Sequence, residues 1–181
     1  MVKLNLPNGL SMTRLLMVPC FFLFTYYWLK GENWMLWPAR AILLLIVASD
    51  FFDGYLARVR GEVTQLGGIL DPLADKLFVT ASFVLLAVFD KIHDWLAITV
   101  VTKDILVSIG WCVFAVLFDK VDVEPSNLGK TATALQFFTV FAVVILPSSF
   151  PIVVLEYLTA AGTIMALVHY AYLASRNPSL R

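Results

Sequence analysis

The sequence predicts an all-α, polytopic membrane protein with six transmembrane helices and a short N-terminal interfacial segment. Composition is the first observation behind this prediction: 60% of the 181 residues are hydrophobic, 14% are charged, and the mean hydropathy is +0.85. A soluble domain is normally about half apolar and about a quarter charged. The second observation is a succession of apolar runs of about twenty residues, the length that crosses a bilayer.

Each expected span is an apolar run that ends at charged or turn-forming residues. The segments between them read KGEN, RVRGEV, DKIHD, DKVDVEPSN and PSSFP. Because PSSFP is short, we expect the fifth and sixth helices to form a tight antiparallel hairpin. No internal repeat divides the chain, so residues 1–181 are expected to form a single membrane domain. The six expected spans are 10–29, 37–57, 67–89, 95–118, 128–146 and 152–173.

The nine residues MVKLNLPNG precede the first span. Pro7 and Asn8 indicate a break before a helix that begins near Ser11, so the start of the chain is expected to lie on the membrane surface.

The distribution of lysine and arginine predicts the orientation, because cytoplasmic segments of membrane proteins carry an excess of both. With the N-terminus inside, the outer segments hold only Lys30, Arg40 and Lys91. We therefore expect both termini in the cytoplasm. The cytoplasmic segments then hold Lys3, Arg14, Arg58, Arg60, Lys120, Lys130, Arg176 and Arg181.

Four aspartates stand near the cytoplasmic ends of two apolar spans: Asp50 and Asp53 in the second, Asp71 and Asp75 in the third. Carboxylates are costly in an apolar surround unless a cation compensates them. Spacings of three and four residues place each pair on one face of its helix. A short loop could bring the two faces together, and the cluster could then hold two divalent cations, Mg²⁺ or Mn²⁺.

Small residues and one arginine accompany the aspartates. Gly54, Ala57 and Gly67 would let a base or a phosphate approach the backbone, or would simply allow close helix packing. Arg58 could hold a phosphate or extend to the membrane surface. A cation transporter is the alternative from another class of protein, but transporters usually place carboxylates near the membrane midplane on broken helices.

The four aspartates, Gly54, Ala57, Arg58 and Gly67 together follow the pattern D-x2-D-G-x2-A-R-x8-G-x3-D-x3-D. This pattern resembles the signature of the CDP-alcohol phosphotransferases, and the likeness extends over essentially the whole chain. It implies an enzyme that transfers a phosphatidyl group from a CDP-linked donor, CDP-diacylglycerol, to an alcohol and releases CMP. It also implies a homodimer with no nucleic-acid partner, in a membrane such as a bacterial inner membrane, with the active site on the cytoplasmic side.

The resemblance also implies residue roles. Asp50, Asp53 and Asp71 would hold the metals, and Asp75 would complete the second metal site and act as the general base on the acceptor hydroxyl. The donor nucleotide would lie against Asp53, Gly54, Ala57, Arg58 and Gly67.

Flanking segments resemble one branch of the family. NLPNGLSMTRLLMVP and LGGILDPLADK are similar to phosphatidylglycerophosphate synthases and to cardiolipin synthases of the eukaryotic type. GKTATALQ resembles the fifth-helix motif G-K-x-K-T-x-x-Q, with Ala132 in place of its second lysine. The residues that this likeness makes candidates for binding the acceptor or a phosphate are Asn5, Thr13, Arg14, Lys130, Thr133 and Gln136. Lys103 is a further candidate, because a lysine deep in a span is costly to leave in lipid.

The fourth span bears on the acceptor alcohol. Phosphatidylglycerophosphate synthases usually carry an Arg-Glu pair there and a further arginine, whereas this chain has Lys103-Asp104 and Trp111. A phosphate dianion favours fork-shaped donors, so the sequence favours phosphatidylglycerol as acceptor, with glycerol 3-phosphate as the alternative. Lys103 could contact substrate or form a structural ion pair. His93 is expected to be solvated. Glu156 could face a cavity or pair with a cation, but its position near the outer end of the sixth span favours solvation at the interface.

Overall fold

The computed structural model describes residues 6–60, 65–117, 127–146 and 151–176, with the backbone alone for 6–15, 50–60, 65–74, 111–112, 114–117 and 174–176. Throughout these ranges every regular element is a helix, which confirms the all-α prediction. The elements are α1 (Leu6–Leu29), η1 (Asn33–Met35), α2 (Leu36–Arg60), α3 (Gln65–Val88), α4 (Asp94–Leu117), α5 (Asn127–Ile145) and α6 (Ile152–Arg176).

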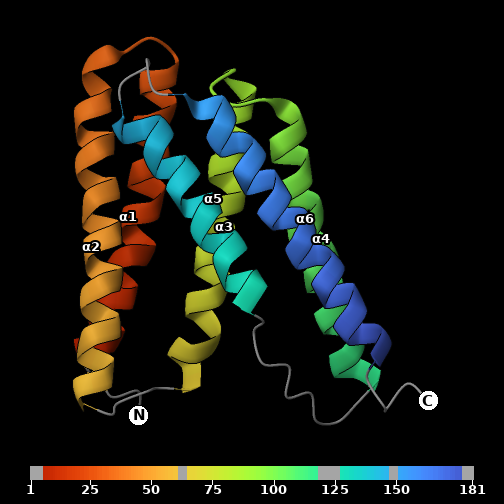
Figure 1. Ribbon diagram of the computed structural model, residues 1–181. Coiled ribbons are helices and arrows are strands. Elements are labelled where there is room, and N and C mark those ends of the chain that lie inside the picture. Colours follow the sequence, from red (N-terminus) through yellow and green to blue (C-terminus); the bar gives the residue numbers. More distant parts are fainter. Residues whose placement is uncertain (1–5, 61–64, 118–126, 147–150, 177–181) are drawn as a thin grey trace. The chain divides into compact units, whose positions relative to one another are not determined.

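The chain divides into two compact units, Met1–Phe78 and Val79–Arg181, and the boundary falls within α3. The first unit is built on α1 and α2, which lie side by side (Figure 1). Its core contains Phe21 of α1, Leu43 and Ile46 of α2, and Phe78 of α3, each at most 3% exposed. The Phe21 and Phe78 rings pack with their centroids 5.3 Å apart.

The N-terminus of α1 corrects one prediction. The helix begins at Leu6 and includes Pro7 and Asn8, which the sequence suggested as a break before Ser11. Proline is tolerated in the first helical turn because the N–H group that it lacks would have no intrahelical acceptor there. The residues before Leu6, where an interfacial segment was expected, lie outside the described part.

Two helix ends have the same C-terminal geometry. After α1, the Gly31 and Glu32 N–H groups donate to the carbonyls of Trp28 and Tyr27, with Gly31 at φ 111°. These are the paired bonds of a Schellman motif, whose left-handed residue is usually glycine. After α3, Asp90 takes the corresponding place at φ 55°, so a side chain that tolerates this conformation ends the helix.

The second unit contains α4, α5, α6 and the end of α3. Helices α5 and α6 pack as the expected antiparallel hairpin: the Thr139 and Thr159 hydroxyls lie 2.7 Å apart, and the Gln136 amide donates to Thr163 over 3.0 Å. Adjacent seam positions are small: a Cβ on Gly162 of α6 would lie 2.9 Å from the Leu135 side chain.

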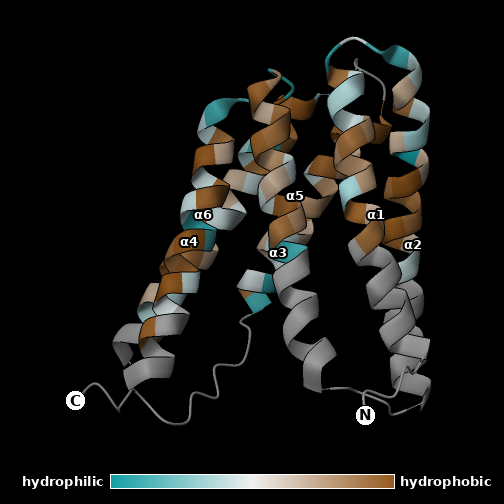
Figure 2. Cartoon of the chain, turned by 180° about the vertical axis from the view of Figure 1, so that it is seen from behind, coloured by the Kyte–Doolittle hydropathy of each residue, from teal (hydrophilic) through white to brown (hydrophobic). Residues whose placement is uncertain are grey.

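Several polar side chains of this unit are buried, while many apolar ones are exposed. Thr139, Thr159 and Thr163 are completely buried, whereas Val154 and Val168 are at least 60% exposed. Figure 2 shows that hydrophobic residues predominate along the coloured parts of the helices and that hydrophilic residues interrupt them at a few positions. Among the described residues, α5 and residues 152–173 of α6 are long and apolar enough to cross a membrane. The six-span arrangement stays a prediction, as does the single domain.

Candidate active site

The four aspartates lie on two uninterrupted helices. Asp50 and Asp53 are in α2, and Asp71 and Asp75 are in α3. Their spacings of three and four residues therefore place each pair on one helical face, as expected. Asp75 is half-buried. For the other three only the backbone is described, so the predicted cluster of side chains lies outside the described residues.

The helix bounds put the aspartates at matching distances from the connection between α2 and α3. Asp53 precedes Arg60 by seven residues and Asp71 follows Gln65 by six, about 10 Å and about 9 Å along the two helix axes. Asp50 and Asp75 are each ten residues from the same two helix ends, about 15 Å. The chain between those ends limits their separation to about 19 Å between Cα atoms.

This placement fits a divalent metal. Four carboxylates provide hard oxygen ligands, which Mg²⁺ and Mn²⁺ prefer. Among the residues whose side chains are described, no three His, Cys, Asp or Glu form a metal-binding group, and three of the four aspartates are not in that set. Gly54, Ala57 and Arg58 lie in α2 and Gly67 in α3, again in the part where the backbone alone is described.

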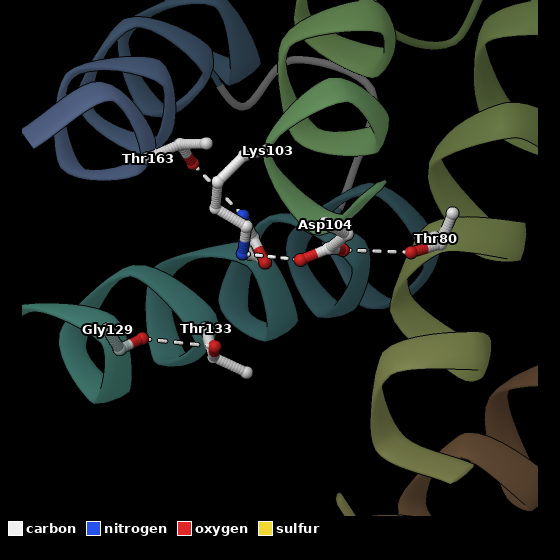
Figure 3. A network of polar contacts seen from close by, with 7 residues as sticks. Thr80, Lys103, Asp104, Gly129, Thr133 and Thr163 are labelled. Carbon is white, nitrogen blue, oxygen red and sulfur yellow. Dashed lines mark hydrogen bonds and ion pairs between the residues drawn. The ribbon is translucent and has the colours of Figure 1, made fainter. Parts of the chain in front are cut away.

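A buried polar network occupies the second unit (Figure 3). The ammonium of Lys103 lies 2.6 Å from Oδ1 of Asp104, and both residues are at most 7% exposed. The Thr80 hydroxyl of α3 donates to Oδ2 of Asp104 over 2.9 Å. Lys103 therefore forms an ion pair, one of the two roles that the sequence left open. This pair does not exclude the other role, contact with substrate.

The contact between Lys103 and Asp104 is short, but it is not a well-directed hydrogen bond. Oδ1 of Asp104 is buried and has no hydrogen-bond partner of good geometry among the described residues. The two observations agree once the helix is considered, because consecutive residues of a helix point in different directions. The pair is thus held by charge, and Thr80 provides the directed bond that fixes the carboxylate.

The motif residues of α5 have separate environments. Lys130 is exposed. The half-buried Thr133 donates to the carbonyl of Gly129 over 3.1 Å, within its own helix (Figure 3). Gln136 is 1% exposed and bonds to Thr163 of α6. Of the remaining acceptor candidates, Asn5 lies outside the described residues, and Thr13 and Arg14 have a described backbone only.

Comparison with known proteins decides the family. The sequence profile described as CDP-alcohol phosphatidyltransferase matches residues 4–171. The chain belongs to the CDP-alcohol phosphatidyltransferase family. The resemblance inferred from the aspartate motif is confirmed, and the protein is an enzyme of this class.

Relatives of this CDP-alcohol phosphatidyltransferase come from several bacteria. A protein from Sodalis glossinidius (strain morsitans) is 31% identical over 97% of this chain and 98% of its own length. One from Escherichia coli (strain K12) is 32% identical over 75% of this chain and 74% of its own. One from Bacillus subtilis (strain 168) is 32% identical over 78% and 77%. All three are named CDP-diacylglycerol--glycerol-3-phosphate 3-phosphatidyltransferase.

Sequence reasoning missed several polar residues of this phosphatidyltransferase. Thr80 is the one threonine of its expected span and Thr163 is one of two in the sixth, and no local signal distinguished them. Glu156 was expected to be solvated but is 1% exposed, and its carboxylate lies 2.6 Å from the ring of His93. The expectation holds for the His93 side chain, which is 58% exposed.

Proposed function

We propose that this protein transfers the phosphatidyl group of CDP-diacylglycerol to glycerol 3-phosphate, forming phosphatidylglycerophosphate and CMP. The observation that carries this proposal is the name shared by relatives that match as much as 97% of the chain. The shared name supports glycerol 3-phosphate, which the sequence analysis gave as the alternative acceptor. It gives less support to phosphatidylglycerol and cardiolipin-type chemistry, which the residues of the fourth span favoured.

Two divalent cations, Mg²⁺ or Mn²⁺, would be held by Asp50, Asp53, Asp71 and Asp75. When bound, they would neutralise the diphosphate of the donor and stabilise the departing CMP. The matching distances of the two aspartate pairs from the connection between α2 and α3 support this assignment. Asp75 would also take the proton of the acceptor hydroxyl.

The donor nucleotide would lie against α2 and the start of α3. Gly54, Ala57 and Gly67 leave the backbone accessible, and Arg58 can pair with a phosphate. Asp53 would be shared between this pocket and the metals. This pocket is supported by the spacing of these residues in the sequence, which is the same as in the family signature.

Lys103 is the main candidate for binding the acceptor's phosphate. A buried ion pair seldom repays its desolvation cost through stability alone, so an ammonium kept there favours a functional role. Lysine binds phosphate as a point charge without the fork geometry of arginine. Further contacts would come from Asn5, Thr13, Arg14, Lys130, Thr133 and Gln136.

The enzyme would be an integral membrane protein with six spans, both termini in the cytoplasm and the active site on that side. Two apolar helices and the lysine and arginine distribution support this placement. A homodimer is part of the proposal, and likeness to the family is its support.

Competition between acceptors tests the proposal. Purified protein in detergent, given CDP-diacylglycerol, Mg²⁺ and equal amounts of glycerol 3-phosphate and phosphatidylglycerol, should release CMP and yield phosphatidylglycerophosphate by mass spectrometry. Chelation of the metal should stop the release of CMP. Cardiolipin as the main product would instead establish the other acceptor. Ion flux across liposomes without CMP release would favour a transporter.

A further inference from the structure

We propose that Thr80 is a positioning residue for the acceptor site: through Asp104 it holds the Lys103 ammonium where the acceptor's phosphate binds. This inference rests on the proposed function, because it takes glycerol 3-phosphate as the acceptor. Thr80 would not touch substrate. Its role is to fix the carboxylate that fixes the lysine.

The geometry of the three residues carries the inference. Thr80 Oγ1 to Asp104 Oδ2 is 2.9 Å, and Asp104 Oδ1 to Lys103 Nζ is 2.6 Å (Figure 3). The hydroxyl uses one carboxylate oxygen and leaves the other facing the ammonium. Without Thr80 the carboxyl group could rotate about its side-chain bonds, and the ammonium would lose its fixed counter-charge.

The contact between Lys103 and Asp104 is not a complete set of hydrogen bonds, because Oδ1 of Asp104 has no directed partner among the described residues. An ammonium has three N–H donors, and within the described part of the chain its one recorded ion-pair contact is Oδ1 of Asp104. That oxygen is buried without a directed hydrogen bond. A pair built only for stability would be expected to satisfy its donors and acceptors, because unsatisfied buried polar groups are costly. A phosphate oxygen would add a second anionic acceptor for the Lys103 ammonium.

The hydrogen bond from Thr80 to Asp104 begins on α3, the helix that also contains Asp75. Thr80 follows Asp75, the proposed general base, by five residues in the same helix. The residue that orients the phosphate-binding lysine is therefore carried by the helix that carries the base. Disturbing Thr80 should change how well the acceptor binds without changing how the donor binds.

Steady-state kinetics of Thr80→Val test the inference, since valine keeps the shape of threonine and removes only the hydroxyl. We expect KM for glycerol 3-phosphate to rise roughly three- to tenfold, as for the loss of one hydrogen bond, with KM for CDP-diacylglycerol unchanged. Thr80→Ser should restore the original value. The control is Thr99→Val: the Thr99 hydroxyl donates to the Trp95 carbonyl of its own helix, and the KM values of this variant should not change.

Repeating the Thr80→Val substitution in a Lys103→Met variant shows whether Thr80 acts through Lys103. Lys103→Met should raise KM for glycerol 3-phosphate by itself, and adding Thr80→Val should then cause no further rise. An unchanged acceptor KM in Thr80→Val, or equal rises for donor and acceptor, would overturn the positioning role while leaving the proposed function intact. Absence of any phosphatidylglycerophosphate from the unmodified protein would overturn the proposed function itself.

Discussion

The ring Nδ1 of His93 lies 2.6 Å from Oε2 of Glu156, and the backbone N–H of His93 approaches Oε1 at 3.4 Å. One buried carboxylate thus holds both the side chain and the backbone of the residue that precedes α4. Beside it, the Trp95 and Tyr157 rings stack with their centroids 5.3 Å apart. These contacts join the N-terminal ends of α4 and α6.

Removing this carboxylate should destabilise the second unit. In Glu156→Ala the N–H of His93 loses its buried acceptor, so we expect the free energy of unfolding to fall by about 1–3 kcal/mol. Thermal unfolding in detergent would measure the loss. Glu32→Ala is the control, because the bond of Glu32 to the Trp34 indole is exposed and its removal should have little effect. Equal melting temperatures for the two variants would contradict the structural role.

The Glu156 contact also illustrates what the sequence could predict. The all-helical fold, the hairpin of α5 and α6 and the aspartate motif follow from periodicity, connection lengths and residue spacing, which are local properties. The partners of Glu156 and Asp104 lie 63 and 24 residues away, and no local pattern announces them. Pro7 was misleading because a proline favours a break in general but is also favoured in a first helical turn.

The hydroxyl pair of Thr139 and Thr159 should stabilise the hairpin. Both residues are fully buried and their Oγ1 atoms lie 2.7 Å apart. A double-mutant cycle with Thr139→Val and Thr159→Val should give a coupling of about 0.5–1.5 kcal/mol in unfolding free energy. In Thr139→Val the Thr159 hydroxyl keeps its longer contact to the Leu135 carbonyl at 3.4 Å, and in Thr159→Val the Thr139 hydroxyl keeps its 2.9 Å bond to the same carbonyl. Because the bond between the hydroxyls is already lost in either single variant, the double variant should lose less than the sum of the two. Strict additivity would indicate that the hydroxyls do not interact.

Asp75→Asn should abolish turnover while leaving the fold and donor binding largely intact. Asparagine has a similar shape, but it cannot accept the acceptor's proton, and it is a weaker metal ligand than a carboxylate. Losing a positioned general base costs about a hundred- to ten-thousandfold in rate. CMP release measures turnover, and the melting temperature reports the fold. Wild-type turnover in this variant would remove Asp75 from both roles.

We expect position 129 to require glycine, because the Tyr170 side chain lies against it and leaves no space for a Cβ atom. A Cβ at Gly129 would overlap the hydroxyl of Tyr170, whereas a Cβ at Gly110 in α4 would meet no described atom within 4 Å. Gly110→Ala should therefore stabilise the protein by as much as about 1 kcal/mol through helix propensity. Gly129→Ala should instead destabilise it by about 1–3 kcal/mol through steric overlap.

Tyr170→Ala shows whether this overlap is the cause. In that background the neighbouring ring is gone, so Gly129→Ala should become neutral or stabilising, as it is expected to be at Gly110. Thermal unfolding of the four variants of the cycle measures this reversal of sign. If Gly129→Ala were equally destabilising with and without the tyrosine, the close approach of α6 would not explain the glycine, and a role for Gly129 in binding would become the better explanation.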